Sequence, residues 1–105
     1  MENHANKAVT FILENAPKYA LAKATRVQLE EFRKSKKAIL MSNEEGTLGA
    51  KEMYAYAHPE YVALLMDIKQ AIMEEEEIRW KLEAAKLRVE VFKTEEYTRR
   101  LEMKL

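Results

Sequence analysis

Apolar residues follow the spacing of one long helix through the second half of the chain. From Pro59 onward no helix breaker appears, and apolar side chains recur at alternating steps of four and three residues. Nine of the twelve positions in this pattern are apolar, so the segment 59–104 is predicted to form a helix with a coiled-coil-like seam. The seam expected to mediate self-association comprises Leu64, Ile68, Ala71, Ile78, Leu82, Ala85, Val89 and Phe92.

A second helical pattern covers the segment of about 4–42. A stripe of apolar or uncharged residues recurs there at a mean spacing of 3.6, the period of an α-helix. Its members are Leu21, Ala24, Gln28, Phe32, Ser35 and Ile39. Pro17 interrupts the segment, because proline lacks the backbone donor that a helix interior uses. We expect a short helix and a long one that are nearly continuous; one continuous helix kinked at Pro17 and a true break at Pro17 are the alternatives.

The segment of about 43–49 holds both glycines of the chain beside several turn-forming side chains, and it predicts a turn. A short helix of about 50–57 follows, with Thr47 as its candidate cap, before Pro59 opens the long helix. No run of alternating β-branched residues predicts a strand. The chain is therefore expected to be all-α, with residues 1–105 forming a single helical domain built as a long antiparallel hairpin.

Large apolar residues outside the seam point to self-association. In a two-helix hairpin these residues stay exposed; they are Leu65, Ile72, Trp80 and Leu87. A chain of 105 residues also buries only about 65% of its unfolded surface by itself. A homodimer that pairs two hairpins into a four-helix arrangement would bury the remaining apolar stripes.

The composition excludes several kinds of chemistry. Without cysteine the chain has no disulfide, thiolate zinc site or thiol nucleophile, and two glycines leave no Gly-rich phosphate loop. Neither His4 nor His58 has a second ligand at a metal-binding spacing. No apolar run reaches the roughly 20 residues that cross a membrane. We expect no catalytic residue, cofactor, metal or membrane partner, and therefore no enzyme.

The charges balance overall but not along the chain. There are 18 basic and 18 acidic residues, with a balance of +4 over residues 1–43 and −4 over residues 44–105. Basic residues that are candidates for contact with nucleic acid are Lys23, Arg26, Arg33, Lys34, Lys36 and Lys37. An ordinary solvated helix face is the alternative, because acidic residues adjoin this cluster and no aromatic residue is interleaved with it.

Acidic residues concentrate at positions 74–77. Consecutive helical residues point in different directions, so a solvated face is expected here rather than a cation site. Glu75 occupies a seam position, and Arg79 lies one turn later. The two are expected to form an i,i+4 pair and a polar layer that fixes the register of association.

Aromatic residues gather where the chain enters the long helix. Tyr54, Tyr56 and Tyr61 are interpreted as the packing of a helix corner, with contact to a partner protein as the alternative. Trp80 lies off the seam and is the stronger candidate for a partner contact, because tryptophan is enriched in binding hot spots.

Four sequence segments resemble proteins of a known kind. They are APKYALAKA at 16–24, LEEFRKSKKA at 29–38, AYAHPEY at 55–61 and RWKLEAA at 79–85. Together they resemble small helical proteins of tailed bacteriophages and prophages, encoded in early regions near recombination or replication genes. The resemblance implies a phage origin and the cytoplasm of a bacterial host, and it transfers no catalytic residue.

These observations lead to two hypotheses of function. The first is a non-catalytic phage accessory protein, a helical homodimer that acts as an interaction module or inhibitor on a phage or host protein. The alternative is an accessory nucleic-acid-binding protein of phage recombination or replication, which uses the basic face of residues 33–37.

Overall fold

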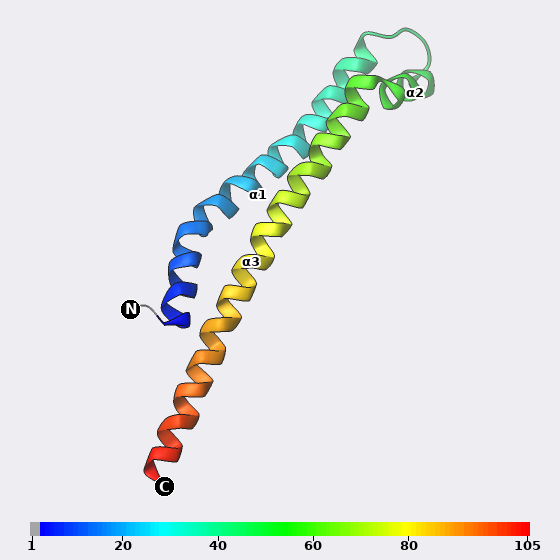
Figure 1. Cartoon of the computed structure of the whole chain (residues 1–105). Coiled ribbons are helices and arrows are strands. Elements are labelled where there is room, and N and C mark those ends of the chain that lie inside the picture. Colours follow the sequence, from blue (N-terminus) through cyan, green and yellow to red (C-terminus); the bar gives the residue numbers. More distant parts are fainter. Residues whose placement is uncertain (1–2) are drawn as a thin grey trace. The chain divides into compact units, whose positions relative to one another are not determined.

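A computed structural model describes residues 3–105 and contains three helices (Figure 1). They are α1 (His4–Ser42), α2 (Leu48–Ala57) and α3 (Pro59–Lys104), of 39, 10 and 46 residues. No strand occurs within this described part of the chain. The all-α prediction is confirmed, because Ala, Leu, Glu, Lys and Met dominate the long segments and lose little on entering a helix.

Helix α1 runs without a break through Pro17. The helical region of about 4–42 is therefore confirmed as one continuous helix rather than a short and a long one, and a break at Pro17 is excluded. Good helix formers on both sides of Pro17 outweigh the one backbone hydrogen bond that proline removes. At the start of α1 the side chain of Asn3 acts as a cap, accepting a hydrogen bond of 2.7 Å from the backbone N–H of Asn6.

Helix α2 begins two residues earlier than expected, at Leu48, and is capped at both ends. The hydroxyl of Thr47 accepts a hydrogen bond of 3.2 Å from the N–H of Ala50, which is the predicted cap. Gly46, directly before Thr47, has a φ of 125°, a conformation that favours glycine. His58 then separates α2 from α3, and its Nδ1 accepts a hydrogen bond of 3.1 Å from the N–H of Glu60.

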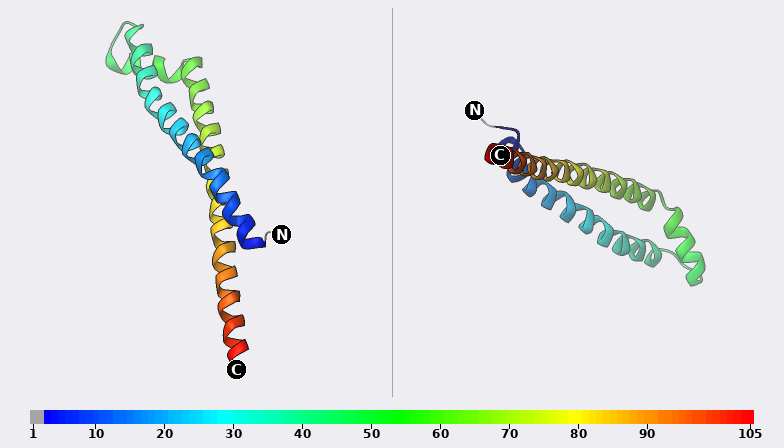
Figure 2. Two further views of the ribbon diagram at one scale, coloured as in Figure 1. Left: turned by 90° about the vertical axis from the view of Figure 1, so that its left-hand side faces the viewer. Right: turned by 90° about the horizontal axis from the view of Figure 1, so that it is seen from below.

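The chain divides into two compact units, which we describe separately. The first joins the described residues up to Ala20 with Glu76–Leu105, and the second is Leu21–Glu75. In the second unit α1 and α3 run antiparallel, because residues 26 and 36 of α1 meet residues 75 and 60 of α3. Figure 2 shows α2 lying across the end of this unit, between the end of α1 and the start of α3.

The core of the second unit forms where α2 meets the two long helices. Leu40, Ala55 and Tyr61 come from the three different helices and are all buried, with Met41 packed against them. Ala55 is completely inaccessible, so only a small side chain fits at this position. This cluster holds α2 in place.

The predicted seam of α3 is turned inward within a single chain. Its buried members are Leu64, Ile68 and Ala71 in the second unit, and Leu82 and Ala85 in the first. Ile78, Val89 and Phe92 are half-buried. In the first unit Ala5 and Ala8 supply the buried face of α1. Most of the seam is therefore already buried before any second copy is added.

Candidate binding surfaces

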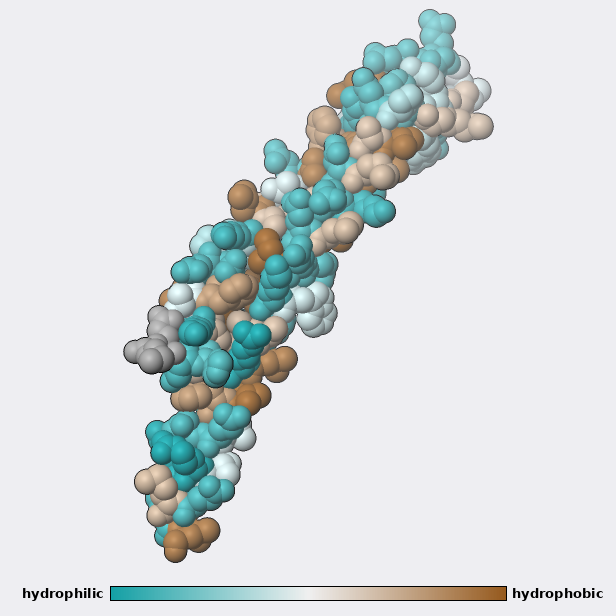
Figure 3. Space-filling model, in the orientation of Figure 1, coloured by the Kyte–Doolittle hydropathy of each residue, from teal (hydrophilic) through white to brown (hydrophobic). Residues whose placement is uncertain are grey.

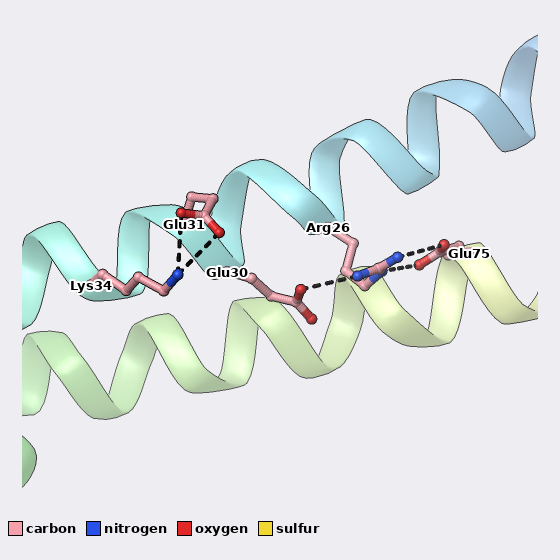
Figure 4. A network of polar contacts seen from close by, with 5 residues as sticks. All are labelled: Arg26, Glu30, Glu31, Lys34 and Glu75. Carbon is pink, nitrogen blue, oxygen red and sulfur yellow. Dashed lines mark hydrogen bonds and ion pairs between the residues drawn. The ribbon is translucent and has the colours of Figure 1, made fainter.

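An ion pair between the buried Glu75 and the partly buried Arg26 joins the two long helices of the second unit (Figure 4). Glu75 is only 6% exposed, although it is ionisable and lies in an apolar seam. The guanidinium of Arg26 donates to both of its carboxylate oxygens, through Nε and through Nη2 at 3.1 Å, and also reaches Glu30 at 3.0 Å. The hydrogen bond to Glu75 is the main reason that the pKa of Arg26 is raised. Arg26 is thus committed to the fold rather than displayed for nucleic acid.

Glu75 is paired in the structure, but with a different residue from the predicted Arg79. Its cross-helix partner is Arg26, 49 residues away in the sequence. Arg79 instead forms an ion pair of 2.8 Å with Glu76, and this raises the pKa of Arg79. Spacing along one helix could not indicate a partner on another helix.

Lys36 is the second member of the basic cluster that serves the fold. Its Nζ lies 2.6 Å from the carboxylate of Glu60, at the start of α3. This lysine holds the pKa of Glu60 below its ordinary value. Lys23 is exposed, and Lys34 forms a surface pair of 3.3 Å with Glu31 (Figure 4). The six basic candidates therefore do not form one surface.

Three of the six basic candidates, including Lys34, line a hollow beside the core of the second unit. This hollow has a volume of about 370 Å³ and is bounded by Arg33, Lys34, Lys37, Tyr56 and Tyr61. The Nζ of Lys37 lies 4.7 Å from the ring centroid of Tyr56, a cation–π distance. The rings of Tyr56 and Tyr61 meet edge to face, with centroids 5.4 Å apart.

Sequence reasoning missed this combination of cations and aromatic rings. It found no aromatic residue interleaved with the basic cluster, because Tyr56 follows Lys37 by 19 residues and lies on a different helix. The fold of α2 brings them together. The nearby phenol of Tyr56 also raises the pKa of Lys37, more than any other group does.

The four aromatic candidates for partner contact differ in exposure. Tyr61 lies in the core, and Tyr54 packs edge to face on His58 with centroids 5.6 Å apart. Tyr56 keeps 48% of its surface exposed. Trp80 is 61% exposed, with the guanidinium of Arg79 at 4.6 Å from its ring centroid.

The stripe found in the sequence of α1 faces away from the core. We call Leu21, Ala24, Gln28, Phe32, Ser35 and Ile39 the outer stripe, and all six are exposed. Leu21, Phe32 and Ile39 are 70%, 48% and 51% exposed, whereas Leu40 beside them is 4% exposed. On α3 the predicted off-seam residues Leu65, Ile72 and Leu87 are exposed as well. Figure 3 shows hydrophobic side chains reaching the surface among hydrophilic ones.

Two further properties bear on the class of site. Within residues 3–105 no group of three or more His, Asp or Glu side chains is placed to hold a metal ion. No helix in the same range combines the length and apolar character needed to cross a membrane.

Comparison with protein-family models, with curated proteins and with solved structures gives no match for this chain.

Proposed function

We propose that the protein is a non-catalytic helical interaction module that assembles as a homodimer through the outer stripe of α1. In this proposal each chain is an antiparallel helical hairpin that keeps the seam of α3 inside. Two hairpins pair into a four-helix arrangement. The observation that carries the proposal is the exposure of Leu21, Phe32 and Ile39 on one face of one helix.

The size of these side chains makes their exposure costly in a monomer. Burying a large apolar side chain stabilises a protein by about 1.5–3 kcal/mol relative to leaving it in water. Exposed apolar patches on soluble proteins commonly mark interaction sites, and the outer stripe has three large apolar residues with Gln28 and Ser35 between them. Three such residues at helical spacing therefore favour a partner that lies along α1.

A second copy suits this surface because the outer stripe carries no charge. Its polar members are the neutral Gln28 and Ser35. Two identical stripes can therefore meet around a two-fold axis without bringing like charges together. The amide and hydroxyl groups of these residues can form hydrogen bonds in the interface or at its edge.

The assembled module would act on another protein. The resemblance to phage early-region proteins supports a phage accessory role in the cytoplasm of the host, as an adaptor or inhibitor of a phage or host protein. Trp80 is the proposed contact, because it is 61% exposed and its ring is held by Arg79 rather than by the core.

Mass measurement of the full chain tests the homodimer. Light scattering at micromolar concentration should give about twice the chain mass of 12.3 kDa. The double variant Leu21→Glu/Ile39→Glu should fall to the monomer mass with unchanged helical circular dichroism. Leu48→Glu is the matched control, since Leu48 is 68% exposed and lies off the outer stripe. A monomeric wild-type chain, or a double variant that stays dimeric, would overturn the proposal.

A further inference from the structure

The hollow of about 370 Å³ in the second unit has the chemistry of an anion site. The described residues that line the hollow include three cations from adjacent turns of α1, Arg33, Lys34 and Lys37, and no acidic side chain. An arginine offers five N–H donors and a lysine three. So many donors suit a phosphate, which has more acceptor oxygens than a carboxylate.

The cations of this hollow make weaker contacts than Arg26 and Lys36 do: the Nζ of Lys37 lies 4.7 Å from the ring centroid of Tyr56, and Lys34 pairs at the surface with Glu31. Arg26 and Lys36, which the sequence grouped with them, are taken up by Glu75 and Glu60. Among the described residues, Lys34 pairs with Glu31 at 3.3 Å, with both side chains about two-thirds exposed. Such a surface pair is weak in water, so a phosphate can displace Glu31 from Lys34.

The aromatic wall of the hollow adds a second kind of recognition. Tyr56 is 48% exposed, although Tyr61 meets its ring edge to face and the Nζ of Lys37 lies 4.7 Å from its ring centroid. A flat ligand can stack on the part of the ring that these two residues leave uncovered. Stacking of a base on an aromatic ring beside a basic groove is the common way to bind single-stranded nucleic acid. A volume of about 370 Å³ lies at the small end of the range for ligand pockets, roughly 300–1,000 Å³.

We propose that this hollow binds one nucleotide unit, with its phosphate at Arg33, Lys34 and Lys37 and its base against Tyr56. The site goes beyond the proposed homodimer and does not depend on it, because none of these residues belongs to the outer stripe. The proposed site uses three of the six basic residues that the sequence indicated as candidates for contact with nucleic acid. It also includes the aromatic ring of Tyr56, which the sequence did not indicate. A free nucleotide and a single-stranded nucleic acid both present this chemistry.

Fluorescence anisotropy with a labelled ten-residue oligothymidylate, at about 50 mM salt, tests the site on the full chain. Binding should weaken steeply with added salt, because bound phosphates release counterions. Unlabelled thymidine monophosphate and inorganic phosphate serve as competitors. If thymidine monophosphate displaces the labelled probe as well as unlabelled oligothymidylate does per nucleotide, the ligand is a free nucleotide. If the oligomer binds much more tightly than the monophosphate, the ligand is single-stranded nucleic acid. Inorganic phosphate should compete least.

Variants separate this site from general attraction to a basic helix. Tyr56→Ala should weaken binding by about 5- to 100-fold, while Tyr56→Phe should stay within about 2-fold because it keeps the ring. Arg33→Gln/Lys37→Gln should abolish most binding. Lys23→Gln is the matched control, a lysine on the same helix outside the hollow.

Three results would overturn the proposal. They are no binding of either nucleotide probe at about 50 mM salt, inorganic phosphate competing as well as thymidine monophosphate, or Lys23→Gln weakening binding as much as Lys37→Gln. Circular dichroism of each variant shows whether the helices persist, and Tyr56→Phe keeps the test decisive if Tyr56→Ala unfolds. The mass of each variant reports on the homodimer separately.

Discussion

At the scale of single residues, Glu75 fixes how α1 and α3 align in the second unit. A carboxylate that is 6% exposed within an apolar seam requires a compensating group, and Arg26 supplies it. Sliding either helix by one turn would separate the two groups. The pair therefore favours one register over the others that an apolar seam alone would allow.

Replacing Arg26 by methionine should lower the midpoint of thermal unfolding by about 5–10 °C, because the Glu75 carboxylate loses both hydrogen bonds from the guanidinium. The double variant Arg26→Met/Glu75→Leu should recover most of this loss, since no charge is then left in the seam. Calorimetry of both variants measures the effect. An Arg26→Met protein that melts at the wild-type temperature would show that the pair does not matter for stability.

The ion pair between Lys36 and Glu60 makes stability depend on pH. Lys36 lowers the pKa of Glu60 in the folded chain below the ordinary 4.5, so the stabilisation is present above that pH and is lost as the pH falls through the lowered value. Lys36→Met should therefore reduce stability at pH 7 by more than it does at a pH below the lowered value, where Glu60 is protonated. Urea unfolding of both proteins at the two pH values tests this, and an equal loss at both would contradict it.

The core at the end of the second unit depends on Leu40, which is 4% exposed. Leu40→Ala should reduce the free energy of unfolding by about 2–4 kcal/mol, through lost burial and the cavity left between the helices. Leu48→Ala, at a position 68% exposed, should cost less than about 0.5 kcal/mol. Denaturant titration of the two variants provides the comparison, and similar losses would rule out this core as a main source of stability.

At the scale of helices, the sequence predicted where each element lies but not which side of it is buried. The bounds of α1 and α3 and the Thr47 cap follow from local signals, namely periodicity, breakers and cap residues. The outer stripe of α1 has the helical period, yet it faces solvent. Periodicity identifies a face and does not identify its neighbour. The cross-helix partners of Arg26 and Lys36, which orient α1, are not local information.

Pro17 is the position where the local sequence signal differs most from the observed helix α1. Helix α1 continues through it, so the proline removes one backbone hydrogen bond without ending the helix. Pro17→Ala should restore that bond and raise the free energy of unfolding by about 1–3 kcal/mol. Urea unfolding followed by circular dichroism measures it. A destabilised variant would mean instead that packing in α1 requires the geometry imposed by proline.

At the scale of the whole molecule, a single chain buries most of the seam of α3 but leaves apolar residues exposed on both long helices. Leu64 and Leu82 are buried without any partner, whereas Phe32 and Trp80 are exposed. The seam therefore contributes to the fold of each chain, and the outer stripe of α1 is the surface proposed for self-association. The candidate nucleotide site could not be predicted from sequence, because its tyrosines and its cations come from different helices.

The labelling rate of a single thiol on the outer stripe tests self-association through this face most directly. The chain contains no cysteine, so Ile39→Cys introduces one reactive group, and Gln70→Cys provides a control on an exposed part of α3. As protein concentration rises and the mass doubles, the thiol introduced at position 39 should react at least about tenfold more slowly, because assembly buries it. The control should react at a constant rate. A rate at position 39 that stays unchanged while the mass doubles would contradict the account.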